Sequence, residues 1–222
     1  MLNEIKLKKM IIMKIFNLKA ENISKAFSRN KTIISNINLE LTAGKIIGIA
    51  GPNGSGKTTF LKILCGILKP TSGKVELKID NVLIKSEDYF QHFGYVAPYL
   101  NLYDEFTPLE HIKIMSGLTG TTLDLNKAKE LLETFNLHKK KDDLIRTFSS
   151  GMKQRMKYIL ALQRETEILL FDEPMTNLDS AGVESIHEII KKLTSAGAGV
   201  IIATNDERDK LLCHEIIDVS LK

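Results

Sequence analysis

The 222-residue chain has no tryptophan, only two cysteines and five prolines, and no long apolar run. A membrane-spanning helix needs roughly 18 consecutive apolar residues, so we expect none here. Cys65 and Cys213 lie far apart without C-x-x-C spacing, and the five histidines are scattered without metal-ligand spacing. The sequence therefore predicts core thiols in a reducing compartment and gives no sign of a zinc site.

A strong excess of one charge is also missing. The net charge of +4 and the pI near 8.9 are too mild and too diffuse for a nucleic-acid site, so we expect no nucleic-acid partner. Near the start, the basic residues flank only a short apolar stretch, Met10–Met13, which is too short for a signal peptide. We expect residues 1–13 to form a disordered extension, with a weak anchor on an anionic membrane as the alternative, and residues 14–222 to form the folded domain.

One segment fits the phosphate-binding pattern G-x-x-x-x-G-K-[ST]; it consists of Gly51, Pro52, Asn53, Gly54, Ser55, Gly56, Lys57, Thr58 and Thr59. Its glycines let backbone N–H groups converge on a polyphosphate, and the helix predicted at 60–68 adds a positive dipole end. Lys57 is expected to reach the β- and γ-phosphates and Thr58 to ligate Mg²⁺. An ordinary glycine-rich turn would not need this Lys-Thr pair. The sequence therefore predicts a site for a nucleoside triphosphate.

The apolar patterns predict two kinds of strand. Alternating apolar and polar residues at 15–22 and 32–41 indicate half-exposed antiparallel strands. Continuous apolar runs at 46–50, 168–171 and 200–203 are typical of parallel strands buried on both faces.

Helical periodicity appears at 127–136 and 183–193. Residues from about 99 to 162 contain no buried-strand pattern, so we expect an inserted helical subdomain there. Strands that alternate with helices predict an α/β fold with a three-layer core.

Two carboxylates end one of the predicted buried strands. Asp172 and Glu173 follow the run 168–171 and precede Pro174, at the sheet edge where ligands bind in open α/β folds. Asp172 is suited to hold Mg²⁺, and Glu173 to orient or deprotonate an attacking water. Alone, this segment is equally compatible with a helix N-cap. The Lys57-Thr58 pair upstream favours the catalytic interpretation.

Between these motifs lies the segment 148–155, Phe-Ser-Ser-Gly-Met-Lys-Gln-Arg. Ser149 is a candidate cap for the helix that follows, and the free N–H groups behind it form a second candidate anion site. With three motifs in this order, the chain resembles the nucleotide-binding subunit of an ABC transporter from about Ile15 to its end. The resemblance implies a P-loop NTPase fold of the ABC ATPase type, with an antiparallel β edge and an inserted helical subdomain.

The resemblance also implies a head-to-tail dimer, homomeric or heteromeric, in which ATP bound by one subunit is covered by the other. The residues expected to make that contact across the dimer are Ser149, Ser150, Gly151, Met152 and Asp179. Phe27 matches the aromatic residue that stacks on adenine, with packing on an edge strand as the alternative.

Two positions depart from the family pattern. Pro98 stands where a glutamine is expected to touch Mg²⁺ and the attacking water, and proline has no side-chain donor or acceptor. Asn205 replaces a histidine that contacts the γ-phosphate; its amide can still donate there, or it can cap the segment 206–212. Losing one transition-state hydrogen bond costs roughly 10²- to 10³-fold in rate, so Pro98 and Asn205 predict slow hydrolysis. Glu173 indicates that hydrolysis is retained, with Glu173 and Asn205 as the catalytic residues.

Seven of the fourteen aromatic residues fall between positions 89 and 106. In the family this region receives a helix of the membrane subunit, and Tyr99, Tyr103 and Phe106 are candidates for that docking, with packing between lobes as the alternative. The resemblance implies an ATP-hydrolysing subunit that energises transport, on an exporter-like pattern, at the cytoplasmic face of the membrane. The alternatives are a soluble, non-transport ABC ATPase and a nucleotide-binding regulator with little turnover.

Overall fold

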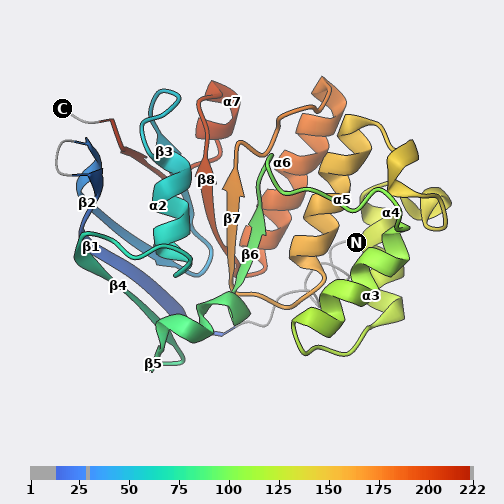
Figure 1. Ribbon diagram of the computed structural model, residues 1–222, viewed down its shortest axis with the longest axis horizontal. Coiled ribbons are helices and arrows are strands. Elements are labelled where there is room, and N and C mark those ends of the chain that lie inside the picture. The colour runs from blue at the N-terminus through green and yellow to red at the C-terminus, as the bar shows by residue number, and fades with distance from the viewer. Residues whose placement is uncertain (1–13, 29–30, 221–222) are drawn as a thin grey trace.

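The computed structural model describes residues 14–28 and 31–220, and the expectation of a disordered extension at 1–13 lies outside them. A five-stranded parallel sheet forms the centre of the fold (Figure 1). Its strands are, in spatial order, β6 (Phe93–Val96), β7 (Ile168–Asp172), β8 (Gly199–Ala203), β3 (Ile46–Ala50) and β9 (Glu215–Asp218). β3, β7 and β8 are almost fully buried, as their continuous apolar runs predict.

A second, antiparallel sheet packs against one side of this centre. Its order is β2 (Lys31–Thr42), β1 (Phe16–Ser28), β4 (Ser72–Ile79) and β5 (Val82–Ile84). Leu18 and Leu41 are adjacent in the β1–β2 register and both are fully buried, so the alternating pattern marks the face that meets the core.

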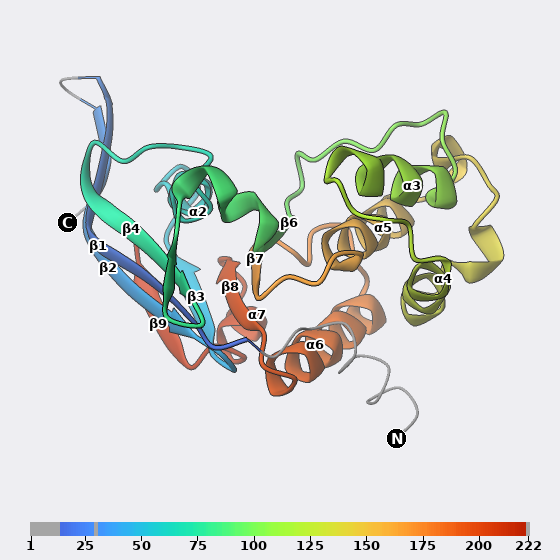
Figure 2. The same cartoon turned by 90° about the horizontal axis from the view of Figure 1, so that it is seen from below.

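Helix α2 (Lys57–Leu64) lies between the two sheets (Figure 2). Its apolar face contributes to the same buried cluster as strands of both sheets, and the members from α2 include Phe60, Leu61 and Leu64. The helix begins earlier and ends earlier than the predicted span 60–68. Gly66 adopts a left-handed conformation with φ of 78°, which ends the helix after Cys65.

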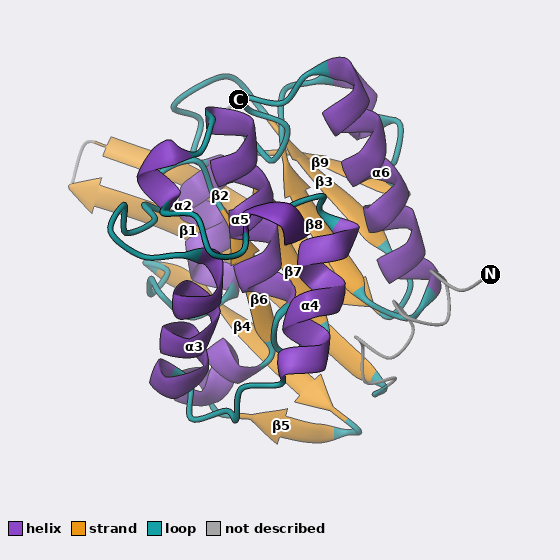
Figure 3. Cartoon of the chain, turned by 90° about the vertical axis from the view of Figure 1, so that its right-hand side faces the viewer, coloured by secondary structure: helices purple, strands orange, loops and turns teal. Residues whose placement is uncertain are grey.

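The other face of the parallel sheet is covered by helices, which a side view shows clearly (Figure 3). α5 (Ser150–Leu162) and α6 (Ser180–Ser195) contribute to one buried cluster with Phe171 and Ile202 of the sheet. α3 (Pro108–Leu118) and α4 (Leu125–Thr134) lie beyond α5.

The remaining helical elements of the described residues are short. They are three 3-10 helices, Ser86–Gln91, His138–Lys140 and Ile145–Thr147, and α7 (Glu207–Lys210). No strand interrupts the segment between β6 and β7, all of which the structure describes. Within the described ranges, no helix is both long and apolar enough to cross a bilayer.

Candidate nucleotide-binding site

The loop between β3 and α2 places the phosphate-binding motif at the carboxyl edge of the parallel sheet. Two of its glycines are required by their surroundings. A Cβ at Gly51 would lie 2.5 Å from Ser55 Oγ, and one at Gly56 would lie 2.7 Å from the side chain of Ile33 on β2. Both also have positive φ angles, 147° and 104°. The loop therefore needs glycine for space and for conformation.

This loop fits a polyphosphate. The side-chain oxygen of Ser55 is buried and has no hydrogen-bond partner among the residues that the structure describes. Gly56 occupies the cap position of α2, and within the described part of the chain no side chain caps the first amides of this helix. Unpaired donors around a concave loop are the groups that a phosphate accepts from.

Lys57 reaches from α2 back over the loop. Its ammonium donates to the carbonyl oxygen of Gly51 at 2.8 Å and lies 3.3 Å from a carboxylate oxygen of Glu173. The side chain is only 6% exposed. One cation is thus held between the glycine loop and the end of β7, where it can neutralise phosphate charge.

Thr58 and Asp172 meet at the base of the site. The Thr58 hydroxyl donates to the Asp172 carboxylate at 2.6 Å, although the residues are 114 positions apart in sequence. Burial raises the pKa of Asp172 above its ordinary value, and the Thr58 hydrogen bond and the Lys57 charge act against it. A hydroxyl and a carboxylate oxygen are hard donors of the kind that Mg²⁺ takes, so these two residues fit the ion.

Glu173 has a left-handed backbone, with φ of 45°. Its N–H donates to Ala203 O of β8 at 2.8 Å, and its carbonyl accepts from the Thr176 hydroxyl at 2.9 Å. This conformation costs a non-glycine residue about 1–2 kcal/mol, and it directs the chain away from β7 into a turn. The alternative of a helix N-cap at these carboxylates is wrong, because the next helix, α6, begins at Ser180 and is capped by Asp179.

Asn205, which follows β8, also reaches the phosphate loop. Its side-chain amide donates to Oδ1 of Asn53 at 3.0 Å. The alternative that Asn205 caps the following segment is wrong: Asp206 is the N-cap of α7 and accepts from the N–H of Arg208. The Arg208 contact also lowers the pKa of Asp206 to about 2.

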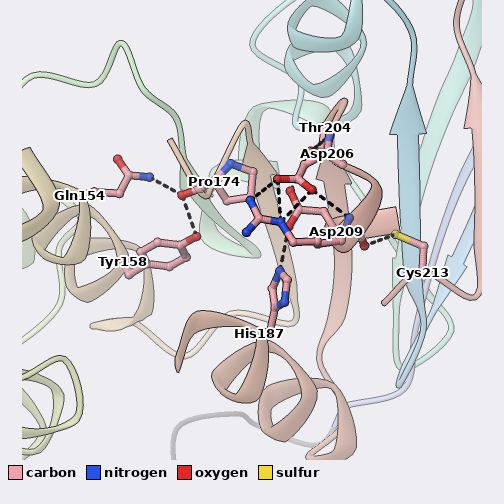
Figure 4. A network of polar contacts seen from close by, with 9 residues as sticks. Gln154, Tyr158, Pro174, His187, Thr204, Asp206, Asp209 and Cys213 are labelled. Atoms are coloured by element: carbon pink, nitrogen blue, oxygen red, sulfur yellow. Dashed lines mark hydrogen bonds and ion pairs between the residues drawn. The ribbon is translucent and has the colours of Figure 1, made fainter. Parts of the chain in front are cut away.

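A buried polar network anchors the residues around Asn205 (Figure 4). Asp209, 1% exposed, accepts from the Thr204 hydroxyl at 2.7 Å and lies 2.8 Å from Nε2 of His187 on α6. The Thr204 hydroxyl in turn accepts from the N–H of Asp206 at 3.0 Å. Sequence reasoning missed Asp209 and His187, because no motif connects them and only the fold brings α6 beside α7.

The residues expected to act across a dimer lie together, apart from the phosphate loop. Ser149 caps α5 by accepting from Met152 N–H at 3.2 Å, as predicted. Four of the five line one surface hollow of about 430 Å³ with Asn177 and Leu178; they are Ser149, Ser150, Gly151 and Asp179. Met152 differs, since its side chain packs on the apolar core of the helices.

The remaining predicted residues lie at the surface. The ring of Phe27, near the end of β1, is 58% exposed and has the Lys25 ammonium 5.2 Å from its centroid. Tyr99 and Tyr103 are 44% and 64% exposed, and Phe106 packs on Tyr103 with ring centroids 5.6 Å apart. Tyr103 lines an apolar hollow of about 400 Å³ with Leu102, Ile114 and Leu118, whereas Tyr99 and Phe106 lie outside it. The Pro98 carbonyl accepts from the Lys157 ammonium at 2.6 Å.

Known proteins share this arrangement. A family model described as ABC transporter matches residues 34–176. The chain belongs to the ABC transporter family. The bacitracin transport ATP-binding protein BcrA of Enterococcus faecalis is 31% identical over 95% of this chain and 67% of its own length. The cytochrome c biogenesis ATP-binding export protein CcmA of Nitrosospira multiformis is 31% identical over 80% of this chain and 86% of its own. The nucleoside import ATP-binding protein NupA of Lactococcus lactis is 37% identical over 76% of this chain but only 35% of its own length.

Solved structures of ABC cassettes superimpose on most of this ABC transporter chain. A dimeric ATP-binding cassette in a post-hydrolysis state, bound to ADP and Pi, has a TM-score of 0.80 and 27% identity, covering 91% of this chain and 94% of that one. Another dimeric cassette structure has a TM-score of 0.78 at 26% identity over the same shares. These matches confirm the predicted family, the fold class, and the assignment as an ATP-binding ATPase subunit.

Proposed function

We propose that this ABC transporter subunit binds Mg²⁺–ATP at the loop 51–59 and hydrolyses it to energise transport through a separate membrane subunit. The observation that carries the proposal is the convergence of Lys57, Thr58, Asp172 and Glu173 from α2 and the end of β7. A mere phosphate-binding loop would not require a strained carboxylate beside the lysine. Mg²⁺, when bound, would neutralise phosphate charge, with Thr58 and Asp172 to hold it.

Different side chains have different roles in the proposed hydrolysis of ATP. Lys57 binds the β- and γ-phosphates, and the amides of the loop and of α2 orient them. Glu173 holds the attacking water and accepts its proton, for which its partly exposed carboxylate at the sheet edge is suited. The Asn205 amide, already bonded to the loop through Asn53, is placed to donate to the γ-phosphate. Phe27 offers an exposed ring for adenine stacking.

The working unit is a dimer of such subunits, homomeric or heteromeric. The hollow formed by Ser149, Gly151 and Asp179 lies away from the phosphate loop of its own chain and carries the exposed N-terminus of α5, which suits it to cover the nucleotide of a partner. The dimeric cassettes to which the chain is similar support this assembly.

The membrane subunit docks near Tyr99, Tyr103 and Phe106, at the cytoplasmic face of the membrane. The apolar hollow lined by Tyr103, Ile114 and Leu118 supports this placement because it suits a short amphipathic helix. We infer export as the direction, on the names of several relatives, although one relative is named for nucleoside import.

Nucleotide titration of a Lys57→Ala variant tests the proposed function. Because the substitution removes a charge-assisted phosphate contact, ATP affinity should fall at least about tenfold by calorimetry. Lys78→Ala, an exposed lysine on β4, is the matched control and should bind ATP as the unaltered protein does. Equal affinity in the Lys57→Ala and Lys78→Ala variants would contradict the assignment. Binding without measurable hydrolysis by the unaltered dimer would favour the regulator alternative.

A further inference from the structure

Two tyrosines, Tyr95 and Tyr99, flank Pro98 in the sequence, and Pro98 is the residue that replaces the expected glutamine. Tyr95 is on β6, and Tyr99 follows in the turn closed by the Leu100 N–H bond to Ala97 O, 3.2 Å long. The two phenol oxygens are 2.5 Å apart. The rings meet edge to face, with centroids 6.4 Å apart. The two tyrosine side chains therefore hold each other in place beside Pro98, which has no polar side chain.

The sheet register directs Tyr95 toward the nucleotide site. Tyr95 is paired with Leu170 in the parallel β6–β7 ladder, so their side chains project from the same face. Asp172 lies two residues beyond Leu170 and therefore projects from that face as well. This is the face covered by α2, since Tyr95 and Leu170 pack in the cluster that contains Phe60. Tyr95 and Asp172 therefore project from one face of the sheet, where the Asp172 carboxylate accepts from the Thr58 hydroxyl.

The turn that carries Tyr99 is held from two sides. On one side the Lys62 ammonium, one helical turn after Thr58, lies 4.7 Å from the centroid of the Tyr99 ring. On the other side the Lys157 ammonium from α5 donates to Pro98 O at 2.6 Å and to Ala97 O at 3.3 Å. The position of the two hydroxyls is therefore fixed by both layers that cover the sheet.

The protonation of the pair suits donation to a carboxylate. A phenol of ordinary pKa, about 10, keeps its proton at neutral pH, so both hydroxyls can donate. The hydrogen bond between the two hydroxyls uses one of their two protons, so the other proton is left for a further acceptor.

We propose that the Tyr95–Tyr99 hydroxyl pair positions the Asp172 carboxylate at the Mg²⁺–ATP site, in place of the glutamine side chain for which Pro98 has no equivalent. The inference rests on the proposed function, and it makes Tyr95 and Tyr99 positioning residues that act through Asp172. The hydroxyls of Tyr95 on β6 and Tyr99 then take the place of the glutamine that Pro98 replaces.

The test measures binding of a non-hydrolysable ATP analogue by calorimetry, with and without Mg²⁺, for Tyr95→Phe and Tyr99→Phe. Losing one hydrogen bond to the carboxylate should raise the Mg²⁺ concentration at half-saturation by about threefold to tenfold and leave the metal-free affinity unchanged. In turnover, kcat should fall with KM for ATP nearly unchanged. Pro98→Gln placed in the Tyr95→Phe background should restore the Mg²⁺ dependence.

Tyr89→Phe is the matched control for a purely structural loss. Tyr89 is also a buried phenol, but its hydroxyl donates to Val75 O and accepts from the Leu77 N–H, away from the site. An equal Mg²⁺ shift in Tyr89→Phe, or none in either Tyr95→Phe or Tyr99→Phe, would overturn the proposal. Absence of nucleotide binding in the unaltered protein would instead overturn the proposed function. Should Tyr95→Phe fail to fold, the half-exposed Tyr99→Phe decides the outcome.

Discussion

The side-chain amide of Asn205 donates a hydrogen bond to Oδ1 of Asn53, with 3.0 Å between the two atoms and 152 positions between the residues. The contact joins the segment after β8 directly to the phosphate loop. A residue that departs from the family pattern therefore still touches the nucleotide-binding machinery. The first prediction follows from this contact.

Asn205→Ala should lower kcat by about tenfold and leave KM for ATP nearly unchanged, because a contact made mainly in the transition state does not support ground-state binding. Asn205→His should raise kcat by about tenfold, near 1.4 kcal/mol of transition-state stabilisation, by supplying the donor that the family pattern has. Steady-state kinetics and melting temperatures check both variants. A loss of stability in both without a change in kcat per folded molecule would refute the catalytic role.

Glu173→Gln should retain the fold and ATP affinity but abolish measurable turnover. The amide preserves shape and removes the base, and it also removes the negative charge 3.3 Å from the Lys57 ammonium, which leaves that cation available to phosphate. The variant should accumulate as an ATP-dependent dimer in sedimentation velocity. Glu184→Gln on the exposed side of α6 should behave as the unaltered protein. Hydrolysis by Glu173→Gln at the parent rate would assign Glu173 another role.

Asp209→Ala should destabilise the protein by about 2–4 kcal/mol, because it leaves the buried Thr204 hydroxyl and His187 Nε2 without their shared partner. Denaturant unfolding measures the loss. Asp206→Ala, which removes a partly exposed cap and ion pair at the same short helix, should cost less. A smaller loss for Asp209→Ala than for Asp206→Ala would show that the network does not anchor this segment.

Cys213 should react slowly with iodoacetamide in the folded protein at pH 8. Burial raises its pKa to about 11, so the reactive thiolate fraction is lower than that of an ordinary thiol by about a hundredfold. Burial raises the pKa of Cys65 as well. Mass spectrometry should find both thiols labelled quickly in urea, and faster labelling of native Cys213 as pH rises toward 11. Rapid native labelling at pH 8 would contradict the buried environment. The sequence predicts a core thiol at Cys213, but in the structure this side chain is only partly buried, whereas Cys65 is buried.

Local patterns of apolar residues predicted much of the fold. The three continuous apolar runs correspond to β3, β7 and β8, and the two alternating segments correspond to β1 and β2. These strands were predictable because the apolar pattern of a strand shows whether one or both of its faces are buried. The strands β4, β5, β6 and β9 were not predicted from the sequence. Val82 of β5 and Ile216 of β9 are exposed on strands at sheet edges, where hydrogen bonding to a neighbour decides the conformation.

The sequence by itself determined the family, and it predicted the phosphate-binding loop and the paired carboxylates, because each of these motifs is contiguous and its chemistry needs particular residues at fixed spacing. Only the tertiary structure decided which of them touch. The Thr58–Asp172 and Asn53–Asn205 contacts join segments far apart in the chain, and Tyr95 shares a face of the sheet with Asp172 only through the β6–β7 register. Such contacts depend on strand order and on which face of the sheet each side chain occupies, and neither is encoded in local periodicity.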